Sequence, residues 1–92
     1  MRDAPFELVV SPTARRQLTE KLPEPVAFAA HEFIIGPLLD NPHRVGKRLS
    51  PPLADRYSAR RGTYRVIYRI DDERRLVAVL AIVHRADAYR TG

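Results

Sequence analysis

Arginines recur in the second half of the sequence, where Arg56, Arg60, Arg65 and Arg69 lie on either side of a short turn signal. Around them polar and apolar residues alternate as in β-strands, so a hairpin places these guanidinium groups on one side of a sheet. Like charges this close together are unfavourable unless they are solvated or face an anion. Such a surface suits the phosphates of a nucleic acid. The alternative is an ordinary solvated face in an arginine-rich protein.

The hairpin has a defined expected register. Glycine in the pair Arg61-Gly62 provides the positive φ that a tight turn requires. With a two-residue loop there, Arg60 pairs with Thr63, and Ser58 pairs with Arg65. One face is then basic and the other apolar, and the apolar face is expected to cover the core. The basic face comprises Arg56, Ser58, Arg60, Thr63, Arg65, Ile67 and Arg69, and the apolar face comprises Tyr57, Ala59, Tyr64, Val66, Tyr68 and Ile70.

A further strand is predicted over 76–84, where the sequence is apolar at nearly every position, as in an interior strand. In the simplest register Arg65 lies opposite Ala81, and Arg85 continues the basic face at the end of the strand. His84 then points to the core side. Because side chains alternate with a period of two, a one-residue change in loop length would reverse these assignments.

The three histidines give weaker indications of chemistry. His31 and His43 are expected to be ordinary surface residues of a helix and of a basic loop. A structural role is the ordinary interpretation for His84, and acid/base chemistry or substrate contact is the alternative. The wide spacing of the histidines and the absence of cysteine indicate that there is no metal site.

The elements that must hold the arginines can also be predicted. A β-branched apolar run indicates a strand at 6–10. Serine followed by proline starts a helix over 12–22, and a second helix covers 24–41, with Pro37 interrupting it. The segment 43–52 is expected to be an exposed basic loop, and its Lys-Arg pair either extends the basic surface or simply aids solubility.

Composition limits the class of protein. The length of 92 residues corresponds to one domain over 1–92. The net charge of +5 is uneven, because residues 1–42 carry four basic and six acidic side chains whereas residues 43–92 carry twelve basic and five acidic ones. No cysteine, secretory signal or membrane-length apolar run is found in the sequence. These properties predict a cytoplasmic protein without a membrane segment.

Three segments together resemble one known family. These are S-A-R-R-G-T-Y-R-V-I-Y-R-I-D at 58–71, V-H-R-A-D-A-Y-R at 83–90 and N-P-H-R-V-G-K-R-L at 41–49. They resemble the RelE family of toxins in the RelE/ParE superfamily, and the third segment is similar to that of actinobacterial-type members. The resemblance extends over 6–90. It implies an α/β (α+β) RelE-like fold in which a mainly antiparallel sheet of about four strands packs on two N-terminal helices.

The resemblance implies a toxin of a type II toxin–antitoxin system that enters the ribosomal A site and cleaves mRNA without a metal or other cofactor. In that reaction the ribose 2′-hydroxyl attacks the adjacent phosphate. Matched by position, Arg65 would stabilise the transition-state phosphate, Arg85 would lie near the leaving 5′-oxygen, and Tyr89 would stack on or orient the substrate. The expected partners are a RelB-like antitoxin, mRNA and the ribosome, with DNA contacted only through the antitoxin. The expected RNA-binding residues are Arg56, Arg60, Arg61, Lys47 and Arg48.

One departure from the family pattern concerns the general base. Arg56 stands where the family often has the first of two lysines, and Ser58 occupies the place of the second. Arginine scarcely loses its proton, so the base is unassigned. Arg60 or Lys47 are candidates to replace the lost charge, and His84 is the nearby group able to exchange a proton near neutral pH. The alternatives to a ribonuclease are a ParE-like non-enzymatic inhibitor of DNA gyrase and a basic RNA-binding domain without inhibitory role.

Overall fold

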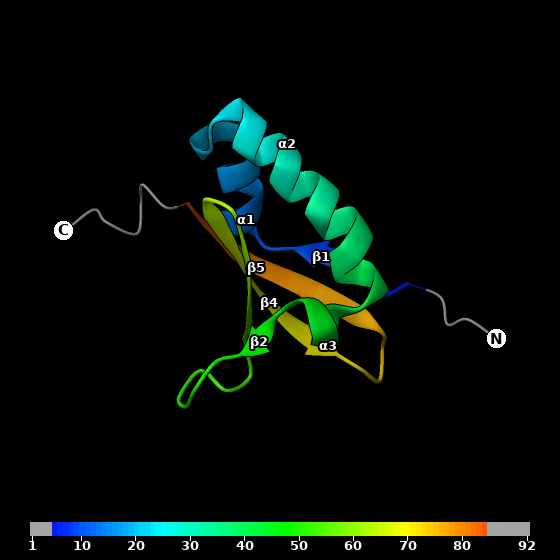
Figure 1. The fold of residues 1–92 in the computed structure, drawn as a ribbon. Coiled ribbons are helices and arrows are strands. Elements are labelled where there is room, and N and C mark those ends of the chain that lie inside the picture. Colours follow the sequence, from blue (N-terminus) through cyan, green and yellow to red (C-terminus); the bar gives the residue numbers. More distant parts are fainter. Residues whose placement is uncertain (1–4, 85–92) are drawn as a thin grey trace.

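A computed structural model describes residues 5–84 of the chain, and its mixed α+β architecture is the predicted one (Figure 1). One five-stranded sheet has the order β1-β5-β4-β3-β2; β1 is parallel to β5, and the other neighbours are antiparallel. The elements in chain order are β1 (Glu7–Val10), α1 (Pro12–Arg16), the π-helical turn η1 (Gln17–Lys21), α2 (Glu24–Phe33), the π-helical turn η2 (Ile34–Leu38), α3 (Pro42–Val45), β2 (Lys47–Arg48), β3 (Tyr57–Arg61), β4 (Tyr64–Asp71) and β5 (Leu76–His84).

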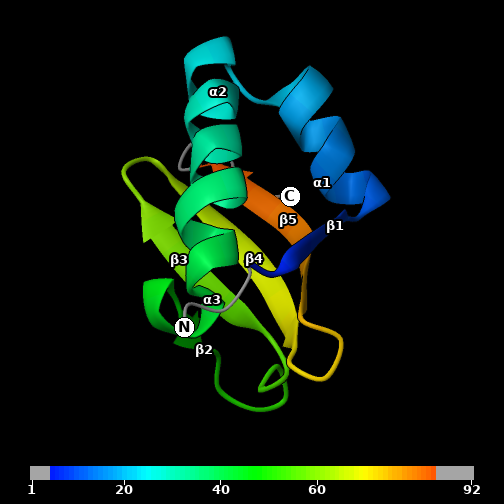
Figure 2. The ribbon, with the colours of Figure 1, turned by 90° about the vertical axis from the view of Figure 1, so that its right-hand side faces the viewer.

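The helices cover one side of the sheet and leave the other side open (Figures 1 and 2). We call these the helix side and the open side. In Figure 2, α2 passes in front of β3 and β4, while α1 lies beside β1 and β5. Among residues 5–84 no helix has both the length and the apolar character that a membrane crossing requires. The buried hydrophobic residues are Phe6, Ala14, Ala30, Phe33, Ile34, Leu38, Tyr57, Ala59, Tyr64, Val66, Tyr68, Val77, Val79 and Ile82.

The predicted helix signals are confirmed. Ser11 is the N-cap of α1, and its hydroxyl oxygen accepts a hydrogen bond from the Ala14 amide (3.0 Å). The same hydroxyl donates to the Leu80 carbonyl (2.7 Å), which joins the start of the helix to β5. Pro37 interrupts the regular α-helix as expected, because the chain passes it in the wider turn η2.

The basic segment after the helices is more regular than a loop. Residues 42–45 form the short helix α3, and Lys47 and Arg48 form β2, which pairs with the outer edge of β3. The expectation of an exposed loop over 43–52 is therefore wrong for its first half. The sheet accordingly has five strands, where about four were expected, because a two-residue strand carries no sequence signal of its own.

The β3–β4 hairpin has the predicted faces but a different register. Its loop is Gly62-Thr63, so Arg60 pairs with Arg65 rather than with Thr63. Gly62 has the predicted positive φ (+57°). The error is a shift of two residues, which leaves every side chain on its expected side of the sheet.

The register between β4 and β5 differs from the expected one and contains a bulge. The loop is one residue shorter than expected, which puts Val77 and Val79 on the helix side, where both are fully buried. An irregularity at Leu80 then restores the predicted alternation, since Tyr68 pairs with Val79 whereas Ile67 pairs with Ala81. As a result Arg65 lies opposite Val83, and not opposite Ala81, so the predicted pairing is wrong.

Candidate nucleic-acid interface

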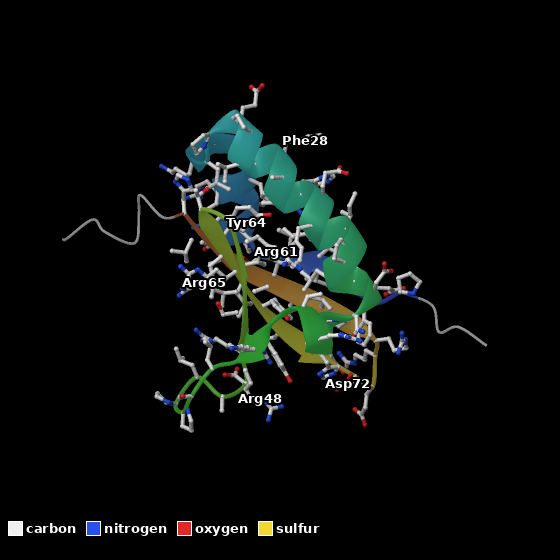
Figure 3. All side chains as sticks on the ribbon, in the orientation of Figure 1. Phe28, Arg48, Arg61, Tyr64, Arg65 and Asp72 are labelled. Carbon is white, nitrogen blue, oxygen red and sulfur yellow. The ribbon has the colours of Figure 1, made fainter. Side chains whose placement is uncertain are left out.

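Two arginines face each other on the open side of the sheet. Arg60 on β3 and Arg65 on β4 are direct cross-strand partners, and both side chains are exposed. Directly opposed residues have Cβ atoms about 4.5–5.5 Å apart. Within residues 5–84 neither guanidinium group has a carboxylate partner. The arrangement concentrates positive charge at one point of the open side. Figure 3 shows Arg65 on the side of the sheet away from the helices.

The other two arginines of the predicted face are partly neutralised. Arg69 Nε lies 3.7 Å from Asp55 Oδ2, and Arg56 Nε lies 3.9 Å from Asp55 Oδ1. All three side chains are substantially exposed, so these ion pairs contribute little to stability. The open side therefore has one end, near Asp55, where a single carboxylate partly neutralises two arginines. At the other end, Arg60 and Arg65 have no carboxylate partner within the described residues.

Lys47 joins the open side from β2. Its cross-strand partner is Ser58, the residue at which the resemblance leads us to expect a lysine. Ser58 and Arg60 are two residues apart on β3, about 7 Å along the strand, so both point to the same side. The structure thus pairs Lys47 with the position at which the resemblance leads us to expect a lysine.

Arg61 and Arg48, which were predicted to contact RNA, lie on the helix side. Arg61 pairs with Tyr64, and its guanidinium carbon lies 4.6 Å from the centre of the Phe33 ring (Figure 3). Arg48 pairs with Tyr57 and lies 5.5 Å from the centre of that ring. These contacts are cation–π interactions that cover aromatic surface. The structure does not bring the two arginines together with Arg60 and Arg65.

The residues predicted at the end of β5 divide into two groups. His84 is half-buried, pairs with Tyr64 and lies on the helix side, as the alternation predicts. It is therefore on the side of the sheet opposite to Arg65. Burial raises the pKa of the Tyr64 hydroxyl, and the positive charge of Arg61 lowers that pKa by a smaller amount. Arg85 and Tyr89 lie outside the described residues.

A cluster of polar side chains that the sequence did not predict lies at the β2 end of the helix side. His43 Nε2 is 2.8 Å from Asp72 Oδ1, although 29 residues separate them in the sequence. The Tyr57 hydroxyl oxygen lies 3.5 Å from His43 Nδ1, and Arg48 Nη2 donates to that oxygen (3.2 Å). No spacing in the sequence signals this cluster, because α3 and the β4–β5 turn meet only in the folded chain.

A metal site is not formed by the described part of the chain. Across residues 5–84, no three His, Asp or Glu side chains are close enough together to hold an ion. What the open side offers is positive charge and hydrogen-bond donors, which suit a phosphate group and the charge that develops on it.

Comparison with known proteins identifies the family. The profile of the family described as "ParE toxin of type II toxin-antitoxin system, parDE" matches residues 8–89. Toxin RelE of Mycobacterium tuberculosis is 48% identical over 88 residues, covering 96% of this chain and 90% of the relative. Toxin RelG of the same organism is 51% identical over 86 residues, covering 94% and 98%.

Solved structures of related toxins have the same fold as this chain. The toxin–antitoxin complex RelBE2 from M. tuberculosis contains a chain that is 49% identical, with a TM-score of 0.85, covering 89% of this chain and 100% of the other. The isolated RelE toxin of E. coli has a TM-score of 0.70 at 21% identity, covering 86% and 83%, and shows the same fold. Sequence identity, family profile and fold together show that this chain belongs to the RelE family, among the type II toxin–antitoxin toxins of the RelE/ParE superfamily.

Proposed function

We propose that this toxin is a ribosome-dependent endoribonuclease that cleaves mRNA in the A site and so inhibits translation. The observation that carries the proposal is the exposed pair Arg60 and Arg65, opposed across two strands without a carboxylate partner in residues 5–84. The pair is costly in isolation, and a phosphate between the two groups relieves the repulsion. Membership of the RelE family agrees with this substrate.

The chemistry follows from the atoms of RNA. The ribose 2′-oxygen attacks the adjacent phosphorus, its proton passes to a base, and the bond to the 5′-oxygen breaks as that oxygen gains a proton. The products are a 2′,3′-cyclic phosphate and a free 5′-hydroxyl. Arg65 stabilises the negative charge on the phosphate oxygens, with Arg60 beside it. Arg85 acts near the leaving 5′-oxygen and Tyr89 orients the substrate, as the family pattern implies.

Lys47 is the cation that we assign to the place of the missing lysine. It is opposite Ser58 on the same side as Arg65, and β2 is separated from β4 by two strand spacings, about 10 Å. Long flexible side chains bridge such a gap to one phosphodiester. His84 is the alternative proton acceptor, and because it lies on the helix side it would have to act around the end of the sheet. Arg56 is placed at greater distance along the RNA, whereas Arg61 and Arg48 lie on the helix side and take no part in the proposed RNA contact.

The proposal includes a partner. The related toxins of M. tuberculosis, E. coli and Pyrococcus horikoshii have been solved as complexes with their RelB-type antitoxins. We infer that a RelB-like antitoxin binds this chain and that acidic residues on it neutralise the open side. DNA is then contacted only through the antitoxin.

The test is to induce the toxin and sequence the 5′ ends of cellular RNA. Cleavage at codons of translated messages, with naked RNA cut poorly, is the expected result. The double variant Arg65→Ala with Arg85→Ala should lose both cleavage and growth inhibition. Arg15→Ala, an exposed arginine on α1, is the matched control and should behave as wild type. A double variant that still arrests growth would show that the function is wrongly assigned.

The second candidate is a non-enzymatic inhibitor of DNA gyrase. It is favoured by one observation, namely that the matching family profile is described as a ParE toxin. After induction, loss of DNA supercoiling before any fall in protein synthesis would support the gyrase inhibitor. A fall in protein synthesis that comes first would support the ribonuclease.

A further inference from the structure

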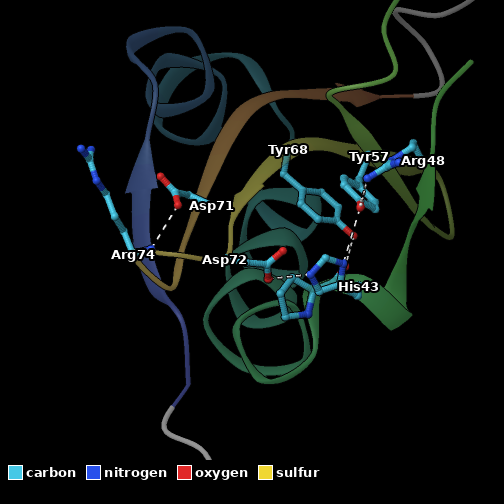
Figure 4. Close-up of polar contacts among 8 residues, drawn as sticks. His43, Arg48, Tyr57, Tyr68, Asp71, Asp72 and Arg74 are labelled. Atoms are coloured by element: carbon cyan, nitrogen blue, oxygen red, sulfur yellow. Dashed lines mark hydrogen bonds and ion pairs between the residues drawn. The ribbon is translucent and has the colours of Figure 1, made fainter. Parts of the chain in front are cut away.

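Four polar side chains form a continuous chain of contacts on the helix side of the sheet, where β2 meets β3 (Figure 4). Arg48 donates to the Tyr57 hydroxyl, which lies beside His43 Nδ1. His43 in turn contacts Asp72 through Nε2. When the imidazole carries its proton on Nε2, every donor in the chain meets an acceptor, because the Tyr57 O–H points to Nδ1 and the Nε2–H points to the carboxylate.

The acceptor for Arg48 is held rigidly. The Tyr57 ring stacks on Tyr68, with 5.5 Å between the ring centres and 21° between the planes. Tyr68 is fully buried, and its hydroxyl donates to the Pro42 carbonyl at 2.6 Å. A side chain at Gly46 would collide with the Tyr68 hydroxyl, so the backbone between α3 and β2 lies directly on this ring. The chain of contacts therefore ties α3, β2 and the β4–β5 turn to one fixed point.

β2 depends on this anchorage. It has only two residues, at the edge of the sheet, paired as Lys47 with Ser58 and Arg48 with Tyr57. So short a strand is weakly held by its own ladder. Because successive side chains of a strand point to opposite sides, holding Arg48 on the helix side holds Lys47 on the open side.

We infer that Tyr57, His43 and Asp72 are positioning residues that act through Arg48 to hold Lys47 against the RNA on the opposite side of the sheet. The inference rests on the proposed function for the role of Lys47, whereas the anchorage of β2 is a property of the fold. None of the three residues touches the substrate. Their effect on cleavage passes entirely through the placement of the Lys47 ammonium group.

The test is a double-mutant cycle on the full-length toxin with mRNA on programmed ribosomes. Lys47→Ala should slow single-turnover cleavage about tenfold or more, the cost of a lost charge-assisted contact. Tyr57→Phe keeps the ring and its stacking but removes the link, and should slow cleavage about threefold to tenfold. In the Lys47→Ala background, Tyr57→Phe should have no further effect. A merely destabilising change would slow both backgrounds equally.

A second measurement does not depend on activity. The Leu49 amide, which follows β2, donates to the Arg56 carbonyl (2.9 Å) and reports whether the strand stays paired. Its hydrogen exchange should be at least about fivefold faster in Tyr57→Phe and Asp72→Ala than in wild type. Glu73→Ala, at the next position of the same exposed turn, is the matched control and should leave the rate unchanged.

Each outcome decides a different point. Unchanged Leu49 exchange in both variants overturns the anchorage whatever the enzyme activity is. Additive effects of Lys47→Ala and Tyr57→Phe overturn the positioning role. If Arg65→Ala abolishes cleavage while Lys47→Ala leaves the cleavage rate unchanged, the assignment of Lys47 is wrong and the ribonuclease function stands. If wild type cleaves no mRNA, the proposed function fails together with the role of Lys47, and faster Leu49 exchange still supports the anchorage alone.

Discussion

Arginines lie on both sides of the sheet and have different roles on each side. On the helix side, Arg61 lies over the Phe33 ring and covers aromatic surface. On the open side, Arg60 and Arg65 oppose each other with no carboxylate partner in the described residues. An arginine side chain therefore stabilises the fold on the helix side, whereas the two opposed arginines on the open side destabilise it. Which side of the sheet an arginine occupies therefore indicates more about function than the number of arginines does.

The largest effect that separates the two sides is expected for Arg65→Ala. If the ribonuclease proposal holds, cleavage should fall by about 100-fold to 1,000-fold, as when one donor to a developing oxyanion is removed. The free energy of unfolding should stay within about 0.5 kcal/mol of wild type, because the side chain is exposed and its removal relieves repulsion with Arg60. Single-turnover cleavage and urea unfolding measure the two quantities. Full cleavage together with a large loss of stability would show that Arg65 stabilises the fold and does not act on the RNA.

The next effect concerns the buried Tyr68 hydroxyl, which lies against the backbone at Gly46, just before β2. Burial raises the pKa of Tyr68 to about 12, with the neighbouring Tyr57 adding a smaller increase. A pKa above the unfolded value of about 10 means that this group stabilises the folded state below pH 10 and loses that contribution as the pH rises from 10 to 12. The total is about 2–3 kcal/mol. The stability difference between wild type and Tyr68→Phe, from urea unfolding at several pH values, should narrow over this range. A constant difference would show that the phenol is not desolvated.

A smaller effect is expected for Arg61→Ala. Loss of the contact with Phe33 and of the packing of the alkyl chain should lower the free energy of unfolding by about 1 kcal/mol. Cleavage should change less than about threefold, because the side chain lies on the helix side. Thermal unfolding and the cleavage assay test this, with Arg74→Ala in the exposed turn as the control for removing one charge. Loss of cleavage at unchanged stability would place Arg61 in the interface after all.

The division of side chains between the two sides of the sheet could be predicted from the sequence, because it depends only on whether a residue stands at an even or an odd position along its strand. A two-residue error in the β3–β4 register left Arg60 and Arg65 on the open side. The expected β4–β5 loop was one residue too long, and such an error exchanges the two sides of the following strand. It put Val77 and Val79 on the open side, whereas both are buried on the helix side. The bulge at Leu80 restored the alternation beyond them. A strand that is apolar at every position gives no periodic signal from which such a bulge could be predicted.

The polar chain behind β2 could not be predicted for a different reason. His43 and Asp72 are far apart in sequence, and each looks like a solvated surface residue. Arg48 belonged to a basic pair whose two members were expected to act together, but a two-residue strand sends them to opposite sides. Tertiary contacts of this kind arise from how α3 is placed over the sheet, which no local spacing determines.

The smallest effect distinguishes the two ends of the open side. Asp55 lies near Arg56 and Arg69 but not near the opposed pair at the other end. Asp55→Asn should change the free energy of unfolding by less than about 0.5 kcal/mol, since both ion pairs are exposed. It should tighten binding to a short RNA by about twofold to fivefold at low salt, because two cations become available to phosphates. Fluorescence titrations at two salt concentrations measure this.

The salt dependence decides whether the two ends belong to one interface. If Arg56 and Arg69 bind phosphates once Asp55 is neutralised, the slope of log affinity against log salt should steepen by about one for each additional phosphate that is neutralised. The variant Glu73→Gln removes one negative charge from the turn without freeing either arginine, and should leave the slope unchanged. Equal slopes for both variants and wild type would confine RNA binding to the end at Arg60 and Arg65. In that case the end near Asp55 takes no part in RNA binding, and phosphate would be bound only at Arg60 and Arg65, where no carboxylate compensates the charge within the described residues.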